Sequence, residues 1–110
     1  NIIANFKNDT INRIIAISMT KNGQLATEWY YWNSKLVYVY ESFEFFEESK
    51  KKSGWKNFKN FYARESRYYL VDEKLKYQKH KGKRNPTNSS QINQIIKDGN
   101  NIRNYITKYK

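Results

Sequence analysis

The sequence predicts an α+β fold, in which an antiparallel β-meander of about six strands carries a C-terminal amphipathic helix packed on the sheet. Residues 27–41 concentrate β-branched and aromatic side chains on both sides of a polar Asn33-Ser34-Lys35 interruption, which is typical of two strands joined by a tight turn. A similar order of residues occurs twice more, and a helical period begins after residue 86. We therefore expect a single domain over 1–110, with the meander in 1–80 and the helix in 86–110.

The repeated unit is an aromatic residue, a polar turn and an aliphatic residue. Phe6 to Ile11 aligns without a gap on Tyr31 to Leu36, and Tyr69 to Leu75 matches with one extra turn residue. The second and third copies also share a Lys-Leu pair after the turn and a tyrosine two positions later, at Tyr38 and Tyr77. Three matches with the same internal order predict three repeated hairpins, in which Phe6, Tyr31 and Tyr69 lead into equivalent reversals.

Turn residues and alternation divide the first part of the chain into strands. We expect strands near 2–6, 10–18, 25–32, 35–46, 58–70 and 74–80. Asn22-Gly23 predicts a short turn, because both residues tolerate positive φ. The fourth strand should place Leu36, Tyr38 and Tyr40 on one face, with a β-bulge as an alternative near Phe43.

The two remaining segments have different patterns. Residues 47–57 lack an apolar period and are predicted to form a long loop between the fourth and fifth strands. Segment 80–86 ends the β pattern, and Asn88, Ser89 or Ser90 can cap the helix that follows.

An apolar stripe at a period of 3.6 residues defines the helix and should lie on the sheet. Its members are Ile92, Ile95, Ile96, Ile102, Tyr105, Ile106 and Tyr109. Gly99 costs about 1 kcal/mol relative to alanine inside a helix. The run Asp98-Gly99-Asn100 is therefore a point at which the helix could divide into two pieces.

Length and composition restrict the class of protein. A chain of 110 residues forms one core, and 17% aromatic residues argue against the disorder that a mean hydropathy of −1.02 suggests. The chain has no cysteine, so neither disulfides nor thiolate metal sites can form. No apolar run reaches the roughly 18 residues of a transmembrane segment. The sequence begins at Asn1 without Met, so we expect that an export signal or a longer N-terminal region has been removed.

The net charge of +11 is unevenly distributed. Residues 1–48 contain four Lys or Arg against six Asp or Glu, whereas residues 49–110 contain seventeen against four. Such a basic region favours polyanions, and heavy Lys and Asn use in an AT-biased genome is the alternative explanation. The candidate anion-binding surface consists of Lys50, Lys51, Lys52, Lys76, Lys79, Lys81, Lys83 and Arg84.

Candidate catalytic and metal-binding residues are few. His80 is the single histidine and stands among lysines, so we expect an exposed or turn position and no catalytic role. Four carboxylates lack the spacing of a calcium-binding loop and are expected at a solvent edge: Glu41, Glu44, Glu47 and Glu48.

Glu28 and Glu65 could form a carboxylate pair for acid–base chemistry. However, cross-strand ion pairs with Arg64, Arg67 or Lys35 would account for both residues. We therefore predict a protein that is not an enzyme and that needs no cofactor and no metal. The aromatic residues exceed what one sheet face and a helix can bury, so some should be exposed beside lysines.

The hairpin motifs resemble those of a known group of proteins. Glu28-Trp29-Tyr30-Tyr31 with Lys35-Leu36-Val37, and Arg67-Tyr68-Tyr69 with Asp72-Glu73-Lys74-Leu75, resemble small exported bacterial proteins, often lipoproteins, with repeated Tyr-Tyr-Phe-Asp-x-Gly-Lys-Leu hairpins. The chain is also loosely similar to MORN-like β-meanders over residues 4–80, although the turn glycine is absent from all three copies. The resemblance implies a repeated-hairpin fold and a periplasmic or cell-envelope location.

These observations leave two classes of function. The first is a non-catalytic exported or envelope domain that serves as an interaction module for an unknown protein or envelope component. The alternative is a polyanion-binding protein that uses its basic C-terminal half to bind nucleic acid, anionic lipid or glycan.

Overall fold

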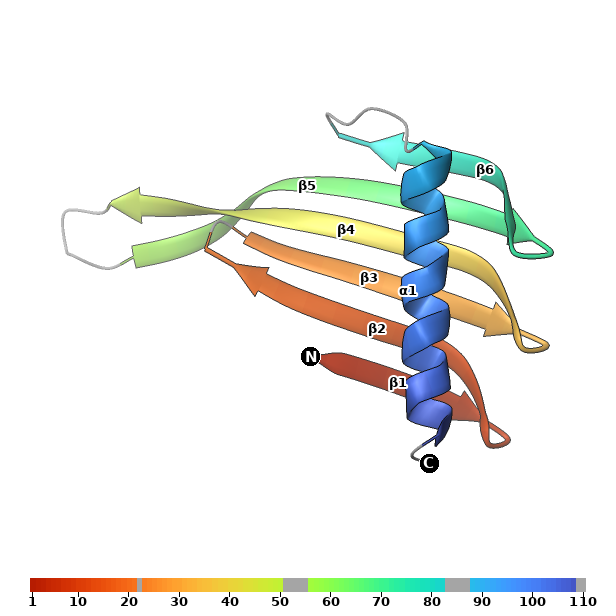
Figure 1. The fold of residues 1–110 in the computed structure, drawn as a ribbon. Coiled ribbons are helices and arrows are strands. Elements are labelled where there is room, and N and C mark those ends of the chain that lie inside the picture. The colour runs from red at the N-terminus through yellow and green to blue at the C-terminus, as the bar shows by residue number, and fades with distance from the viewer. Residues whose placement is uncertain (22, 51–55, 83–87, 109–110) are drawn as a thin grey trace.

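The computed structural model describes residues 1–21, 23–50, 56–82 and 88–108, of which 45–50 and 56–63 are described as backbone only. Its elements are β1 (Ile2–Lys7), β2 (Thr10–Thr20), β3 (Gly23–Trp32), β4 (Lys35–Lys50), β5 (Lys56–Val71), β6 (Lys74–Lys81) and α1 (Ser89–Lys108). The strands adjoin in chain order, every neighbouring pair is antiparallel, and α1 crosses one face of the sheet (Figure 1). The predicted α+β meander with a C-terminal helix is confirmed.

Three two-residue turns connect the repeated hairpins. Asn8-Asp9, Asn33-Ser34 and Asp72-Glu73 have positive φ at both positions, between 50° and 65°. A turn with positive φ at both central residues has a backbone twist that matches the right-handed twist of the flanking strands. Because the turns are equal in length, Leu70 is the structural equivalent of Phe6 and Tyr31. The predicted equivalence of Tyr69, with an extra turn residue, was wrong by one position.

Each hairpin contains a β-bulge at the same distance from its turn. Asn12, Val37 and Lys76 are the additional residues on the second strands of the three hairpins. A bulge changes the phase of side-chain alternation. Leu36 therefore shares the buried face with Val39, and not with Tyr38 and Tyr40 as strict alternation predicted.

A fourth irregularity lies between β4 and β5. The register shifts between Phe45 and Phe46, close to the alternative bulge near Phe43, with the additional residue on β5. The predicted loop over 47–57 was too long, because β4 continues to Lys50 and β5 begins at Lys56. Figure 1 shows these paired ends extending beyond the other strands, where α1 covers neither face. Because neither face is packed against α1 there, these strand ends need no alternation of apolar and polar residues.

The core lies between α1 and the sheet. It contains Ile11, Ile14, Trp29, Tyr31, Leu36, Val39, Tyr68, Leu70 and Ile92. Most of the predicted stripe is confirmed, since Ile95, Ile96, Ile102 and Ile106 pack against this core. Tyr105 is exposed, and Tyr109 lies outside the described residues. Asn88 caps the helix, since its Oδ1 accepts from the Gln91 N–H at 2.9 Å and Gln91 Oε1 accepts from the Asn88 N–H at 3.0 Å.

The helix is continuous through Gly99, which is buried against Trp29. A Cβ atom at residue 99 would lie 2.5 Å from Trp29 Nε1. The indole N–H donates a 2.9 Å hydrogen bond to the carbonyl oxygen of Ile95. Gly99 therefore permits the close approach that fixes α1 on the sheet.

Candidate functional site

The face of the sheet that α1 does not cover, here called the open face, carries a row of tyrosines. Tyr30, Tyr38, Tyr69 and Tyr77 pair directly across β3 to β6 and define the tyrosine row. Successive ring centroids are 5.3, 5.1 and 5.7 Å apart, with interplanar angles of 42° to 49°. These are favourable aromatic contacts, and they form a continuous strip across four strands.

Exposure increases along the tyrosine row toward β6. Tyr30 and Tyr38 are half-buried, whereas Tyr69 and Tyr77 are 40% and 57% exposed. Burial is the largest cause that raises the pKa values of Tyr30 and Tyr38, so both hydroxyls stay protonated at neutral pH. The tyrosine rings that a ligand can reach are therefore concentrated at the β6 end of the row.

Glu28 on the open face has partners on both sides. Its Oε1 accepts a 2.7 Å hydrogen bond from the Tyr30 hydroxyl and lies 4.0 Å from Arg13 Nη1. Arg13 in turn donates through Nε to Asn5 Oδ1 at 2.8 Å. The predicted Lys35 partner is wrong, because Lys35 pairs with Asp72 at 3.3 Å.

Glu65 forms a second group with Tyr40 and Arg67. The Tyr40 hydroxyl donates to Glu65 Oε1 at 2.7 Å, and Arg67 Nη1 lies 3.4 Å from Glu65 Oε2. Arg67 was expected as a partner across the strands, whereas it lies two residues from Glu65 on the same strand. Desolvation, followed by the bond to Glu65, raises the pKa of Tyr40 to about 12, and the same hydrogen bond lowers the pKa of Glu65. Glu28 lies opposite Tyr40 in the β3–β4 register, but its Oε1 accepts from Tyr30, whereas Glu65 accepts from Tyr40.

The strand β6 supplies basic residues beside the exposed tyrosines. Lys79 and Lys81 alternate with Gln78 and His80, and so project on the same face as Tyr77. In register, Lys79 lies opposite Arg67 and Lys81 opposite Glu65.

The structure thus brings part of the predicted anion-binding surface together. Lys76, Lys79 and Lys81 are exposed on β6. Lys50 ends β4 and is described as backbone only. Lys51, Lys52, Lys83 and Arg84 lie outside the described residues.

A groove lies at the half-buried end of the tyrosine row, between the first two turns. Its volume is about 640 Å³, and its lining includes Tyr30, Trp32, Asn12 and Lys7. Trp32 is 66% exposed. An apolar ring next to amide and ammonium groups suits a polar ring-bearing ligand. The tryptophan beside the Asn33 turn was visible in the sequence, but its neighbours from the first hairpin were not.

His80 lies in a polar cluster on the opposite, helix-covered side of the sheet. Its Nδ1 is 2.7 Å from Ser66 Oγ, its Nε2 is 2.6 Å from Gln78 Oε1, and its ring packs edge-on against Tyr68. The expected exposed or turn position was wrong, because His80 is half-buried within β6. Ser66 is fully buried, so its hydroxyl cannot reach a substrate and the cluster satisfies buried polar groups.

Of the four acidic residues of β4, the side chains of Glu41 and Glu44 are described, whereas those of Glu47 and Glu48 lie outside the described part of the chain. Glu41 and Glu44 lie on opposite faces, since Glu41 pairs with Thr27 and Ser66 on the helix side. Over the residues that the structure describes, no three His, Asp or Glu side chains gather as potential metal ligands. Over those same residues, no helix is long and apolar enough to cross a membrane.

Comparison of the chain with protein-family models, curated proteins and solved structures returns no match. The resemblance to exported hairpin-repeat proteins therefore stays a prediction. Only this chain's own residues bear on its function.

Proposed function

We propose that this chain is a non-catalytic binding module of the cell envelope and that its open face binds an anionic polysaccharide. The single observation that supports this is the placement of Tyr69 and Tyr77 beside Lys79 and Lys81 on one uncovered face. Exposed rings provide flat apolar surface for the C–H face of a sugar. The ammonium groups provide charge for its carboxylate or sulfate groups.

The mixed charge of the open face favours a polysaccharide over single-stranded nucleic acid. Glu28 and Glu65 lie on the same face as the tyrosine row. Phosphodiester groups have no hydrogen-bond donor for these carboxylates, whereas sugar hydroxyls can donate hydrogen bonds to them. The groove with Trp32 and Asn12 would extend the same surface by one sugar unit.

The envelope location rests on the resemblance of the hairpin repeats. A full-length reading frame that lacks an export signal would contradict the location but not the binding. The two parts of the proposal therefore stand or fall separately.

Binding is tested by titration at about 20 and 200 mM salt, which spans a large change in screening length. Heparin and polygalacturonate are the anionic probes, dextran is the neutral control, and an oligothymidylate and anionic vesicles represent the other polyanions. We expect heparin and polygalacturonate to bind and to weaken steeply with salt. Tighter binding of the oligothymidylate would favour nucleic acid instead, and no polysaccharide binding at low salt would end the proposal.

Two sets of variants separate stacking from charge. Tyr77→Ala should weaken binding about fivefold to tenfold, from roughly 1 kcal/mol of lost ring contact, whereas Tyr77→Phe should keep it. The double variant K79Q/K81Q should weaken binding by about fivefold at low salt and little at high salt. The matched control is K97Q/K108Q, which removes the same charge from α1. Equal effects of the two double variants would show that net charge alone drives binding.

A further inference from the structure

We propose that two copies of this chain pair through β1 to form a two-fold symmetric dimer with one continuous sheet. Among the strands that the structure describes, β1 has a partner on one side only. The opposite edge, β6, carries Lys74, Lys76, Lys79 and Lys81, and lysines on an edge strand oppose further pairing. By contrast, the single charged side chain of β1 is Lys7. The inference does not depend on the ligand of the open face.

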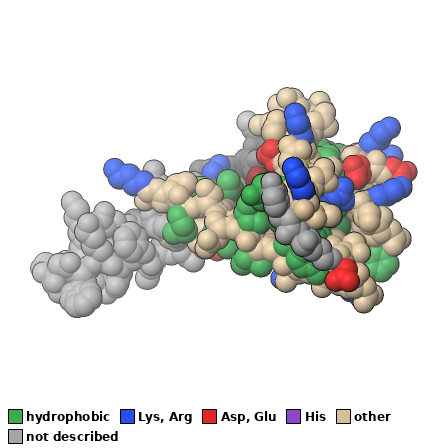
Figure 2. Space-filling model, turned by 60° about the horizontal axis from the view of Figure 1, so that its bottom comes forward, with side chains coloured by type: hydrophobic (Ala, Val, Ile, Leu, Met, Phe, Trp, Pro, Cys, Tyr) green, Lys and Arg blue, Asp and Glu red, His purple; other side chains and the backbone are tan. Residues whose placement is uncertain are grey.

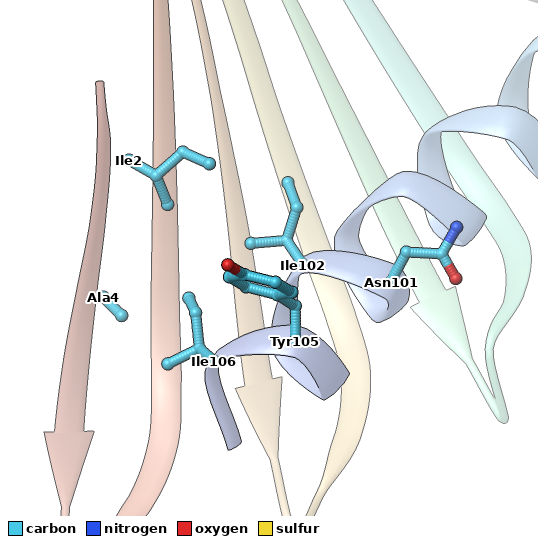
Figure 3. Close-up of a pocket in the computed structure, with 6 residues that line it drawn as sticks. All are labelled: Ile2, Ala4, Asn101, Ile102, Tyr105 and Ile106. Carbon is cyan, nitrogen blue, oxygen red and sulfur yellow. The ribbon is translucent and has the colours of Figure 1, made fainter. Parts of the chain in front are cut away.

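The β1 edge also exposes apolar surface beneath α1. A groove of about 570 Å³, with a lining that is mainly apolar, separates Ile2 and Ala4 of β1 from Ile102, Tyr105 and Ile106 of α1 (Figure 3). Ile2 is 57% exposed and Phe6 is 45% exposed. Figure 2, which turns the β1 side of Figure 1 forward, shows hydrophobic side chains grouped on this side of the molecule. The helix therefore leaves this edge incompletely covered.

The backbone of β1 dictates which register a second strand can take. Asn1 and Ile17 exchange both main-chain hydrogen bonds, at 3.1 and 2.8 Å. Because the direction of these groups alternates along a strand, Ile2, Ala4 and Phe6 direct their N–H and C=O groups away from β2. A two-fold axis at Ala4 would pair Ala4 with Ala4 of the second copy and Ile2 with Phe6 of the second copy. These three pairings supply about six main-chain hydrogen bonds.

The side chains fit the same register. Ile2, Ala4 and Phe6 all project on the helix side, since Ala4 pairs with Ile14 and Phe6 with Ile11 of the core. Phe6 of the second copy would then lie beside Ile2 at the apolar groove, while the small Ala4 occupies the axis. This self-complementarity is what an isologous interface requires and favours a second copy over an unrelated strand.

The charge distribution is compatible with such a dimer. Residues 1–48 contain four Lys or Arg against six Asp or Glu, so this part of the chain, which includes β1, contributes none of the net charge of +11. Pairing through β1 would place the two basic β6 edges at the far ends of the joined sheet. Repulsion between the two β6 edges is thereby kept small.

A single cysteine tests the register directly, because the natural chain has none. In a hydrogen-bonded antiparallel pair the Cα atoms are about 5.5 Å apart, which suits a disulfide. We expect Ala4→Cys to form a disulfide-linked dimer under mild oxidation, and Lys79→Cys on the opposite edge to remain largely monomeric. No cross-link at residue 4, or equal cross-linking of the two variants, would overturn the proposal.

Sedimentation velocity between about 1 and 200 μM, a range suited to a small interface, tests the dimer without cysteine. The wild type should shift toward dimer with concentration. Ala4→Pro removes the outward N–H of β1 but no bond to β2, so it should remain monomeric with an unchanged circular dichroism spectrum. A wild type that is monomeric throughout, or an Ala4→Pro variant that still dimerises, would refute β1 pairing. If Ala4→Pro does not fold, the cysteine pair decides the question.

Discussion

Replacing Gly99 with alanine tests how α1 is held on the sheet. In an exposed helix this change stabilises by about 1 kcal/mol, because alanine has the higher helix propensity. Here the new Cβ would lie 2.5 Å from Nε1 and 2.8 Å from Cγ of Trp29. Both atoms belong to a rigid, buried ring, so the helix or the indole must move.

The expected magnitude follows from three opposing contributions. Overpacking of a core costs about 1–3 kcal/mol. Displacement of the indole also weakens the 2.9 Å hydrogen bond from Trp29 to the Ile95 carbonyl, which is worth about 1 kcal/mol. After the gain of about 1 kcal/mol in helix propensity, the free energy of unfolding should fall by about 1–3 kcal/mol.

Urea unfolding followed by tryptophan fluorescence measures this change. The control is Asn104→Ala, at an exposed position of the same helix, where the same propensity argument predicts a small gain of a few tenths of a kcal/mol. The two alanine substitutions should therefore have opposite signs. A Gly99→Ala variant as stable as the wild type, or more stable, would refute the proposed packing of Trp29 on α1.

Two further predictions concern Tyr31 and the second turn. Burial raises the pKa of Tyr31 to about 12. The stability that Tyr31 contributes is therefore complete below about pH 10 and is lost as the pH rises toward 12, by roughly 3 kcal/mol in total. Tyr31→Phe should remove this part of the alkaline destabilisation in urea titrations at pH 8 and 11, and an unchanged pH dependence would show that Tyr31 is not its source. Ser34 has a φ of 63°, and its backbone oxygen accepts a hydrogen bond from Arg103, which a glycine would keep. Because glycine adopts positive φ without strain, Ser34→Gly should raise the free energy of unfolding by about 0.5–1 kcal/mol. A loss of stability in thermal unfolding would contradict this account of the turn.

The turns were predictable because their chemistry is local. Asn, Asp and Ser tolerate the left-handed conformation that all three turns adopt. Ser34 and Glu73 adopt positive φ values of 63° and 61° at the second position of their turns, where no glycine is present. Sequence comparison nevertheless placed Tyr69 where Leu70 belongs, because it matched aromatic identity, whereas the equal turn length determines the register.

The bulges and the candidate site depended on information that the sequence does not display. The additional residues of the three bulges, Asn12, Val37 and Lys76, differ in chemical type. The alternation of apolar and polar residues along the strands therefore does not reveal where the bulges lie. Within the hairpins, the equivalence of Tyr38 and Tyr77 was predicted correctly. The tyrosines form one row only because Tyr38 pairs with Tyr69 across the β4–β5 hairpin. The loop predicted for that hairpin was too long to give this register.

The open face and the β1 edge would act together if both proposals hold. A two-fold axis at Ala4 perpendicular to the sheet leaves both open faces on the same side, so one long polymer could contact two tyrosine rows. Bivalent contact raises apparent affinity without any new contact at either site. Ala4→Pro should then weaken binding of long polygalacturonate while leaving binding of a short oligomer unchanged, whereas K79Q/K81Q should weaken both. If Ala4→Pro abolishes the dimer without changing the affinity for long polymer, the two open faces do not share one polysaccharide chain.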